Sequence, residues 1–341
     1  MRGIDLERFA FDTDLTLAIL WMNADGTIYH RYGSRDVRGA HHWLSLDSLT
    51  AGMRASLTAH DTHTVEAPTA RASKPLVMEA IPSYIKRDKG SCIHCHSVRP
   101  ALYEEDLAAG TWTDSKVWAF PPPSQVGIDL DRDEQTRISY VAPDSAAARA
   151  KLNKGDRIAN INGQPIATAS DLMFALDQFS SSGGALTVTY FRGQDDSPKL
   201  AQLALGDGWK EGTPLGFSWR PFKWGLTPAP GFGGTALNRE QLAELGLLLE
   251  ERGAALPLAF KISYLVTWGE NSRFGKVAAK AGLQVGDILT AVLGPDKRPV
   301  ELESVDHFHS WWRLTRKVGE TVTIEVLRGA ETKQLSLPII E

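Results

Sequence analysis

Cysteine is almost absent from this sequence, which has only two cysteines in 341 residues. A zinc site with four cysteine ligands is therefore excluded. Long apolar runs are missing as well, and none approaches the ~18 residues that a transmembrane helix requires, so we expect no membrane span. Neither sign of charge is in large excess: the net charge is −4, which provides no basic surface for nucleic acids. What is present, 43% hydrophobic and 23% charged residues, is typical of a globular protein of two or three domains.

Both cysteines lie in the run Cys92–His96, which reads Cys-Ile-His-Cys-His. This C-x-x-C-H pattern is the attachment signal of c-type haem. Two thiols at this spacing add to the two vinyl groups of the macrocycle, and the histidine directly after the second thiol binds the iron. The sequence thus predicts one covalent haem c held by Cys92 and Cys95, with His96 as the proximal iron ligand.

Two other uses of the same residues stay open. A C-x-x-C pair is a redox dithiol in thioredoxin-like proteins, although there it lies where a strand meets a helix, and residues 82–91 have the composition of an irregular loop. A zinc site would need a second pair of ligands at a comparable spacing, and the chain has no further cysteines.

The sequence leaves the sixth iron ligand open. Candidates upstream of the motif are His60, His63 and Met78, of which the two histidines are preferred. A methionine would raise the reduction potential, and a second histidine would lower it. Residues near the motif that would supply apolar walls are Ile81, Tyr84, Ile85, Leu102, Tyr103, Trp112, Trp118 and Phe120.

The first region predicts a hairpin followed by an amphipathic helix. An apolar strand over Leu15–Met22 and a second strand over Ile28–Tyr32 flank an Asn-Ala-Asp-Gly turn. Ser45 is expected to cap a helix that ends near His60. Its apolar residues fall on one face, which we expect to be buried: Leu46, Leu49, Met53 and Leu57.

From Asp12 to His60 this pattern resembles the C-terminal half of a thioredoxin-like fold. The resemblance implies an incomplete thioredoxin-like segment, because the upstream residues leave no room for the first half of that fold. A thioredoxin-type thiol reaction is therefore not expected in this region.

After three consecutive prolines, residues 121–123, the chain resembles a bacterial-type PDZ domain over about Pro123–Leu205. The matching pieces are Val126-Gly127-Ile128, Ile138–Val141, Pro143–Ala147, Lys154–Ile158, Asn162–Ile166, a helix over Ser170–Phe179 capped by Ser170, and a strand over Leu186–Arg192. PDZ domains bind an extended peptide by adding it to the sheet edge beside the helix. The resemblance implies that the amides near Val126, Gly127 and Ile128 bind the peptide's carboxylate.

The same pattern recurs later in the chain. Residues 150–156 match residues 281–287, and residues 185–193 match residues 321–329. This repetition predicts a second PDZ-like domain, with an insertion that contains a glycine-rich loop and a helix over Asn238–Glu251. We expect Trp224, Gly225 and Leu226 to form its ligand loop.

Two histidines lie in the expected helix of the second repeat, within His307–Leu314. His307 and His309 are two positions apart, so on a helix they point in different directions and do not bind one metal ion. Phe308 and Trp312 are expected to form the buried face.

The hairpin, Cys92–His96 and His307–Leu314 together resemble a bacterial group of exported proteins that join a thioredoxin-like segment, a C-x-x-C-H motif and PDZ repeats. The resemblance implies redox biology in the periplasm. Because residues 1–5 do not resemble a signal peptide, we expect either a mature or trimmed form or a true start further upstream.

We therefore expect an α+β multidomain protein. Its parts are a thioredoxin-like segment in 1–65, a haem-binding segment in 66–122, a PDZ-like barrel or sandwich in 123–206, and a second one with an insertion in 207–341. The predicted function is periplasmic monohaem electron transfer or redox sensing, with docking of a protein or peptide partner. The alternatives are a peptide-binding adaptor whose motif is a dithiol or metal site, and an open-site haem enzyme of the peroxidase type. No pattern indicates hydrolysis or phosphoryl transfer.

Overall fold

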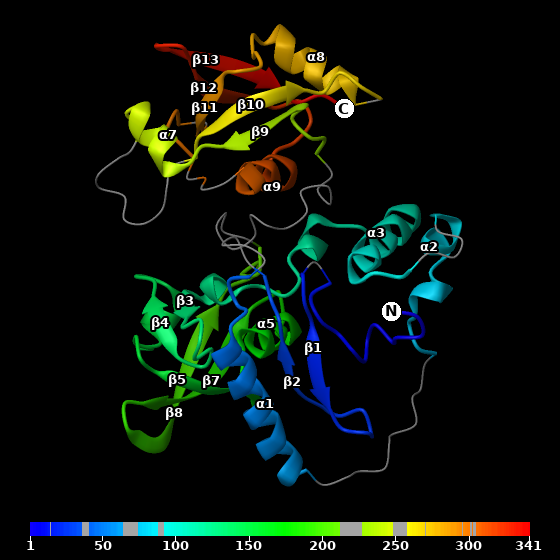
Figure 1. The fold of residues 1–341 in the computed structure, drawn as a ribbon, viewed down its shortest axis with the longest axis vertical. Helices are drawn as coiled ribbons and strands as arrows, with labels where there is room; N and C mark the ends of the chain where they lie inside the picture. Colours follow the sequence, from blue (N-terminus) through cyan, green and yellow to red (C-terminus); the bar gives the residue numbers. More distant parts are fainter. Residues whose placement is uncertain are drawn as a thin grey trace. The chain divides into compact units, whose positions relative to one another are not determined.

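The structure is a computed structural model that describes residues 1–13, 15–35, 41–63, 74–87, 92–211, 227–247, 258–269, 271–294, 296–300, 302 and 305–341. The chain forms two compact units, Met1–Gly212 and Thr213–Glu341. Each unit combines helices with antiparallel sheets (Figure 1), as the expected α+β class requires. No helix among the described residues is long and apolar enough to cross a membrane.

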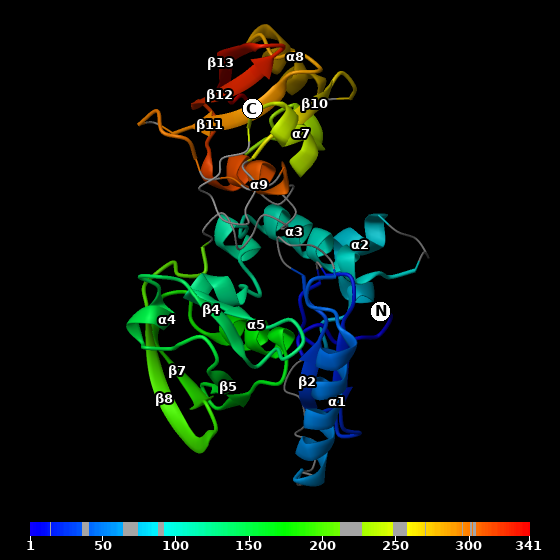
Figure 2. The same ribbon diagram turned by 60° about the vertical axis from the view of Figure 1, so that its left-hand side comes forward.

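The first unit begins with the predicted hairpin and helix. Strands β1 (Ile19–Met22) and β2 (Ile28–Tyr32) pair antiparallel, and α1 (Leu46–Asp61) packs beside them (Figure 2). Ser45 caps α1, since its side chain accepts a hydrogen bond from the Ser48 amide at 3.1 Å. Strand β1 is shorter than predicted and is only half-buried.

The predicted buried face of α1 is wrong. Leu46, Met53 and Leu57 are 77%, 49% and 64% exposed, whereas the buried residues of the helix are small ones spaced four apart: Ser48, Gly52 and Ser56. Small side chains let the helix approach the hairpin closely. A Cβ atom on Gly52 would lie 2.6 Å from the Trp21 ring, so the tryptophan of β1 fills the space that a larger side chain on α1 would need.

Two short helices surround the C-x-x-C-H motif. Helix α2 (Pro82–Arg87) follows the 3-10 turn η1 (Met78–Ala80), and α3 (Val98–Ala109) follows the turn η2 (Cys95–Ser97). Helix α3 ends at Gly110, which has the left-handed conformation. A further 3-10 turn, η3 (Asp114–Val117), comes next. The small core of this region consists of Met78, Ile81, Tyr84, Ile93, Val98 and Ala101.

After a 3-10 turn, the first repeat has the order strand, strand, helix, strand, strand, helix, strand, strand. It begins with η4 (Pro123–Val126). Its further elements are β3 (Ile128–Leu130), β4 (Ile138–Val141), α4 (Ala146–Arg149), β5 (Arg157–Ile161), β6 (Gln164–Pro165), α5 (Ala169–Gln178), β7 (Gly184–Arg192) and β8 (Asp195–Leu205). Strands β3 and β4 form one sheet, and the order of the other is β6-β5-β7-β8. The predicted cap Ser170 is wrong by two residues: Thr168 caps α5, in a capping box with Asp171.

The described residues of the second unit repeat this order with two differences: a helix is inserted after the first strand, and the short strand β6 has no counterpart. Its elements are β9 (Phe232–Ala236), α7 (Arg239–Glu244), β10 (Phe260–Leu265), α8 (Ser272–Lys280), β11 (Ile288–Leu293), α9 (Val305–Thr315), β12 (Thr321–Arg328) and β13 (Glu331–Pro338). The strands form one sheet of order β13-β12-β11-β10-β9, with α8 packed against β9, β10 and β13 and α9 packed against β9. Asn238 caps α7 as expected, but the helix ends at Glu244. The end of the predicted helix, residues 248–251, lies outside the described residues.

The same ion pair occurs at the same place in both repeats. Arg192 donates two hydrogen bonds to Asp156, both of 2.8 Å, and Arg328 donates two to Asp287, both of 2.7 Å. Each arginine ends a strand, β7 or β12, and each buried aspartate follows the Gly residue of the repeated Gly-Asp pair. The internal repetition predicted from the sequence is therefore visible in the contacts as well as in the order of elements.

Candidate functional site

The predicted peptide-binding residues Val126, Gly127 and Ile128 lie in the loop before β3, where the Gly127 amide donates a hydrogen bond to the carbonyl of Ser124 at 3.0 Å. Gly127 has a φ of +87°, a conformation that suits glycine, and its carbonyl accepts a hydrogen bond from the Ala142 amide at 2.8 Å. Its neighbours Val126 and Ile128 are buried. A Cβ atom at position 127 would lie 2.0 Å from that of Ser145, the residue that caps α4. The predicted peptide-binding residues thus form one tight turn at the start of β3.

Strand β3 and helix α5 both contribute to the apolar core of the first repeat. Strand β3 pairs along one edge with β4, and the apolar core of the repeat contains Ile128 and Leu130 of β3 together with Leu172 and Met173 of α5. A peptide that adds to a sheet edge forms main-chain hydrogen bonds with the strand, and its side chains fill the pockets beside it. The other edge of β3 and the flank of α5 are the surfaces on which such a peptide would lie.

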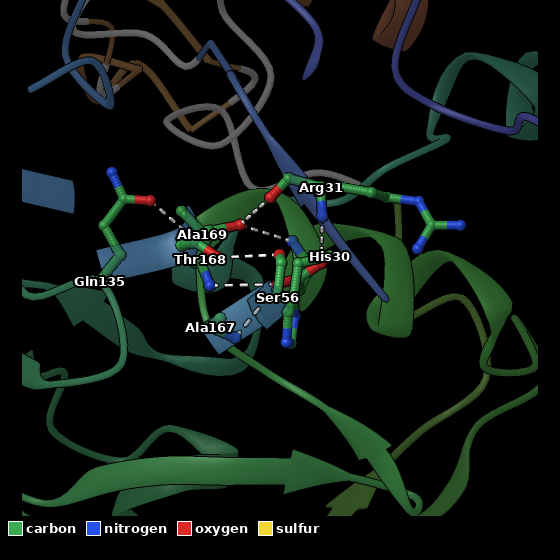
Figure 3. Close-up of polar contacts among 9 residues, drawn as sticks. His30, Arg31, Ser56, Gln135, Ala167, Thr168 and Ala169 are labelled. Carbon is green, nitrogen blue, oxygen red and sulfur yellow. Dashed lines mark hydrogen bonds and ion pairs between the residues drawn. The ribbon is translucent and has the colours of Figure 1, made fainter. Parts of the chain in front are cut away.

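Helix α5 is held in place by a buried polar network (Figure 3). Asp171 binds His30 Nδ1 at 2.9 Å and accepts a hydrogen bond from the Arg31 amide at 2.7 Å. The Thr168 hydroxyl donates to the carbonyl of Arg31. Because buried polar groups that lose their partners are costly, this network attaches β2 to the first turn of α5. Sequence reasoning missed it, since a short polar residue at a helix start indicates only a cap.

The second repeat has a loop of the same form at Gly231. Trp224, Gly225 and Leu226 lie outside the described residues. Gly231 has a φ of +76°, and its carbonyl accepts a hydrogen bond from the Val266 amide at 2.7 Å, as Gly127 does from Ala142. A Cβ atom on Gly231 would lie 2.3 Å from the backbone of Phe274. The equivalent loop is therefore Pro230-Gly231-Phe232, within the glycine-rich stretch assigned above to the insertion.

The two thiols of the C-x-x-C-H motif are free, and its final histidine is exposed. Cys92 is exposed, Cys95 is half-buried, and neither is in a disulfide. Within the described part of the chain, the imidazole of His96 has no hydrogen-bond partner, and its ring stacks on that of His94 with 5.2 Å between centroids. Ile93, between the thiols, is buried in the small core. Two free thiols and an unengaged imidazole are the donor set that a covalent haem c requires.

The preferred sixth ligands do not lie beside this motif. His60 and His63 lie at the end of α1, against the hairpin, where His60 Nδ1 is 2.9 Å from the Tyr29 hydroxyl and His63 Nε2 is 2.8 Å from Asp25 Oδ2. The end of α1 and helix α3 lie on opposite sides of the first unit in both views (Figures 1 and 2). Met78 is fully buried in the same small core as Ile93. In the described part of the chain, no three His, Cys, Asp or Glu side chains converge as a metal site.

A cavity of about 310 Å³ lies along α3. Four of the expected apolar wall residues line it, namely Leu102, Tyr103, Trp112 and Phe120. Ile81 and Tyr84 belong instead to the small core beneath Ile93. The motif residues are not part of the cavity's lining, so the structure brings the apolar walls together without joining them to the thiols.

His309 of α9 is buried, as are Phe308 and Trp312, which confirms the predicted apolar face. Burial lowers the pKa of His309 to about 4, and the nearby charge of Arg313 lowers it further in the same direction. The side chain of His307 lies outside the described residues. His309 is therefore a neutral core histidine at pH 7.

Comparisons with known proteins agree with the form of the first repeat. Residues 119–190 match the family model of the PDZ domain, and this part of the chain is a PDZ domain. A 165-residue stretch is 27% identical to a "Probable periplasmic serine endoprotease DegP-like" of Marinomonas sp. (strain MWYL1). That stretch covers 48% of this chain but only 30% of the relative's length.

Two solved structures of the HtrA-type protease AlgW with a decapeptide also align with the chain. For one, a serine-to-alanine variant, the identity is 14% and the TM-score is 0.26, with 55% of this chain and 49% of that chain covered. For the other, the identity is 18% and the TM-score is 0.24, with 46% and 44% covered. The chain thus spans about half the length of these proteins.

Proposed function

We propose that this protein is an exported redox protein that docks partners through two PDZ-like repeats and carries one haem c at Cys92, Cys95 and His96. Peptide docking is the better supported half of the proposal. The observation that carries it is the repetition of one loop geometry, at Gly127 and at Gly231, each with a left-handed φ and the same main-chain hydrogen bond. The similarity to a probable periplasmic DegP-like protease supports an exported location.

Peptide docking is tested with the full chain and a decapeptide that ends in leucine with a free carboxylate. Hydrogen exchange of residues 126–130 reports the first loop, and that of residues 230–234 reports the second. We expect protection at both loops, and we expect it to disappear when the same peptide carries a C-terminal amide. Equal protection by the acid and the amide would reject carboxylate recognition.

The haem half of the proposal is supported by the donor set, because both thiols are free and His96 has no competing partner among the described residues. When bound, haem c supplies one-electron redox chemistry, while Cys92 and Cys95 hold it and His96 binds the iron. The test is the absorption spectrum of protein made together with a cytochrome c maturation system. Absence of a Soret band, or a band that survives the Cys92→Ala, Cys95→Ala double variant, would reject covalent attachment.

One observation favours the open-site haem enzyme as a second candidate function. His60 and His63 are engaged with Tyr29 and Asp25 at the hairpin, so the preferred sixth ligands lie elsewhere. An iron with an open sixth position gives a high-spin spectrum and binds cyanide. A low-spin spectrum that cyanide does not change would reject this candidate and favour electron transfer.

A further inference from the structure

A short segment of the chain, residues 42–44, lies against the loop that follows β3. The carbonyls of His42 and Leu44 accept hydrogen bonds from Arg132, at 3.1 and 2.7 Å. The carbonyl between them, that of Trp43, accepts one from the Gln135 side chain at 2.8 Å. Three consecutive carbonyls are thus bound by one loop, which is main-chain recognition of the kind that a docked peptide receives.

The same contacts reach across to α5. The side-chain oxygen of Gln135 accepts a hydrogen bond from the amide of Ala169 at 3.0 Å, and Figure 3 shows Gln135 beside the first turn of that helix. Gln135 is buried. Segment 42–44 therefore lies where the loop after β3 meets the first turn of α5.

The side chain of Trp43 is part of the apolar core of the first repeat. It is 1% exposed and belongs to the same core as Ile128 and Leu130 of β3 and Leu172 and Met173 of α5. Burying a tryptophan removes a large apolar area from water. The buried position of Trp43 is therefore strongly favoured over an exposed one.

A peptide bound with its carboxylate at Gly127 would extend toward segment 42–44. A carboxylate held at Gly127 lies at the start of β3, so the upstream residues of the peptide run along β3 toward its end at Leu130. Arg132 and Gln135 follow directly, and both already bind segment 42–44. The upstream residues of a long peptide would therefore collide with segment 42–44.

We propose that segment 42–44 occupies the end of the first PDZ groove that lies away from Gly127. This repeat would then bind only the last few residues of a partner. The inference rests on the proposed peptide docking, and it adds a determinant of specificity: the partner needs a short free C-terminal end, and a longer extended segment adds no affinity. Trp43, Arg132 and Gln135 set this limit.

The test compares a tetrapeptide with a decapeptide that has the same last four residues, both ending in leucine with a free carboxylate. Binding to the first repeat is measured in the full chain by hydrogen exchange of residues 126–130. For the wild type, we expect equal dissociation constants within about two-fold. Arg132→Ala removes two hydrogen bonds to segment 42–44, so the decapeptide should bind that variant about ten-fold more tightly than the tetrapeptide.

Arg137→Ala is the matched control. Arg137 is an exposed arginine of the same loop, and it pairs with Glu134 at 3.1 Å instead of binding segment 42–44. This variant should behave as the wild type does. Gln135→Ala, which removes the bond to Trp43, should act in the same direction as Arg132→Ala.

Two results would overturn the inference while leaving peptide docking intact. One is a wild-type protein that already binds the decapeptide ten-fold more tightly than the tetrapeptide. The other is an Arg132→Ala variant in which both peptides change equally. If neither peptide protects residues 126–130 in any variant, the proposed docking itself is overturned, and the inference with it.

Discussion

Replacing Arg328 by leucine should strongly destabilise the second repeat. Arg328 donates two hydrogen bonds of 2.7 Å to Asp287 and a third of 2.7 Å to the carbonyl of Gly282. The Asp287 carboxylate is 1% exposed. Its remaining partner is the amide of Gln284, at 2.9 Å. Arg328→Leu would therefore leave a buried negative charge with one hydrogen bond.

Leaving a buried acceptor without its hydrogen-bond partners costs roughly 1–3 kcal/mol. The Arg328 side chain is 30% exposed, so water will partly replace it, and we expect the under-bonded Asp287 carboxylate to cost an amount within that range. An arginine in an exposed pair gives the comparison. Arg298 lies 3.6 Å from Asp296, and both are largely exposed, so Arg298→Leu should cost about 0.5 kcal/mol or less.

The loss should depend on pH in a defined direction. Burial raises the pKa of Asp287, but the hydrogen bonds from Arg328 and Gln284 and the charge of Arg328 outweigh it, so the pKa lies below its usual range. A carboxylate with a lowered folded-state pKa stabilises the protein above its unfolded pKa of about 4 and loses that contribution as the pH falls. The difference between wild type and Arg328→Leu should therefore be largest at neutral pH and should shrink below about pH 4.

Hydrogen exchange of β11 and β12 is the suitable assay, because it measures opening of the second repeat separately from the first. The strands β5 and β7 of the first repeat serve as the internal reference and should not change. A loss below about 0.5 kcal/mol, or one equal to that of Arg298→Leu, would refute the role assigned to this pair. Arg192→Leu should have the opposite pattern: hydrogen exchange should become faster in β5 and β7 and should not change in β11 and β12.

Three further predictions concern single positions. Gly127→Ala should lower the melting temperature more than Gly155→Ala, because both glycines have a positive φ but only the first would also press a Cβ atom against Ser145. His309, with a pKa of about 4, should make the second repeat lose up to about 3 kcal/mol as the pH falls from about 6.5 to 4, and urea unfolding of His309→Gln at pH 7 and pH 5 should show no such loss. Leu57→Glu should change stability by less than about 0.5 kcal/mol in urea unfolding, since Leu57 is exposed, and a loss above about 2 kcal/mol would show that the predicted apolar face of α1 is buried after all.

Turns that require residues with particular φ preferences were predictable from the sequence. The Gly-Asp pair of each repeat and the Asn162-Gly163 pair depend on residues with distinct φ preferences, and Gly155, Gly286, Asn162 and Gly163 all have a positive φ. Glycine at a positive φ and asparagine in a tight turn are local constraints, so no knowledge of the tertiary fold is needed to predict them.

Packing partners were not predictable in the same way. The apolar residues of α1 favoured a buried leucine face, whereas the helix packs through Gly52 because Trp21 fills the space above it. The prediction of a ligand loop at Trp224-Gly225-Leu226 falls outside the described residues, and the hydrogen bond from Val266 to Gly231, which gives the second repeat a loop like that at Gly127, joins residues that no local pattern relates. Both depend on residues that are distant in the sequence.

The buried contacts also bear on how the N-terminal region and the first PDZ repeat work together. His30 and Arg31 bind Asp171, and Trp43 lies in the core of the repeat, so the predicted boundaries at residues 65 and 122 are crossed by buried contacts. A repeat separated from residues 1–65 would expose the core around Trp43 and would leave Asp171 bound mainly by the amides of its own helix start. Peptide binding by the isolated repeat would therefore describe a different groove from the one in the intact chain. For this reason, the length dependence of peptide binding has to be measured on the full chain.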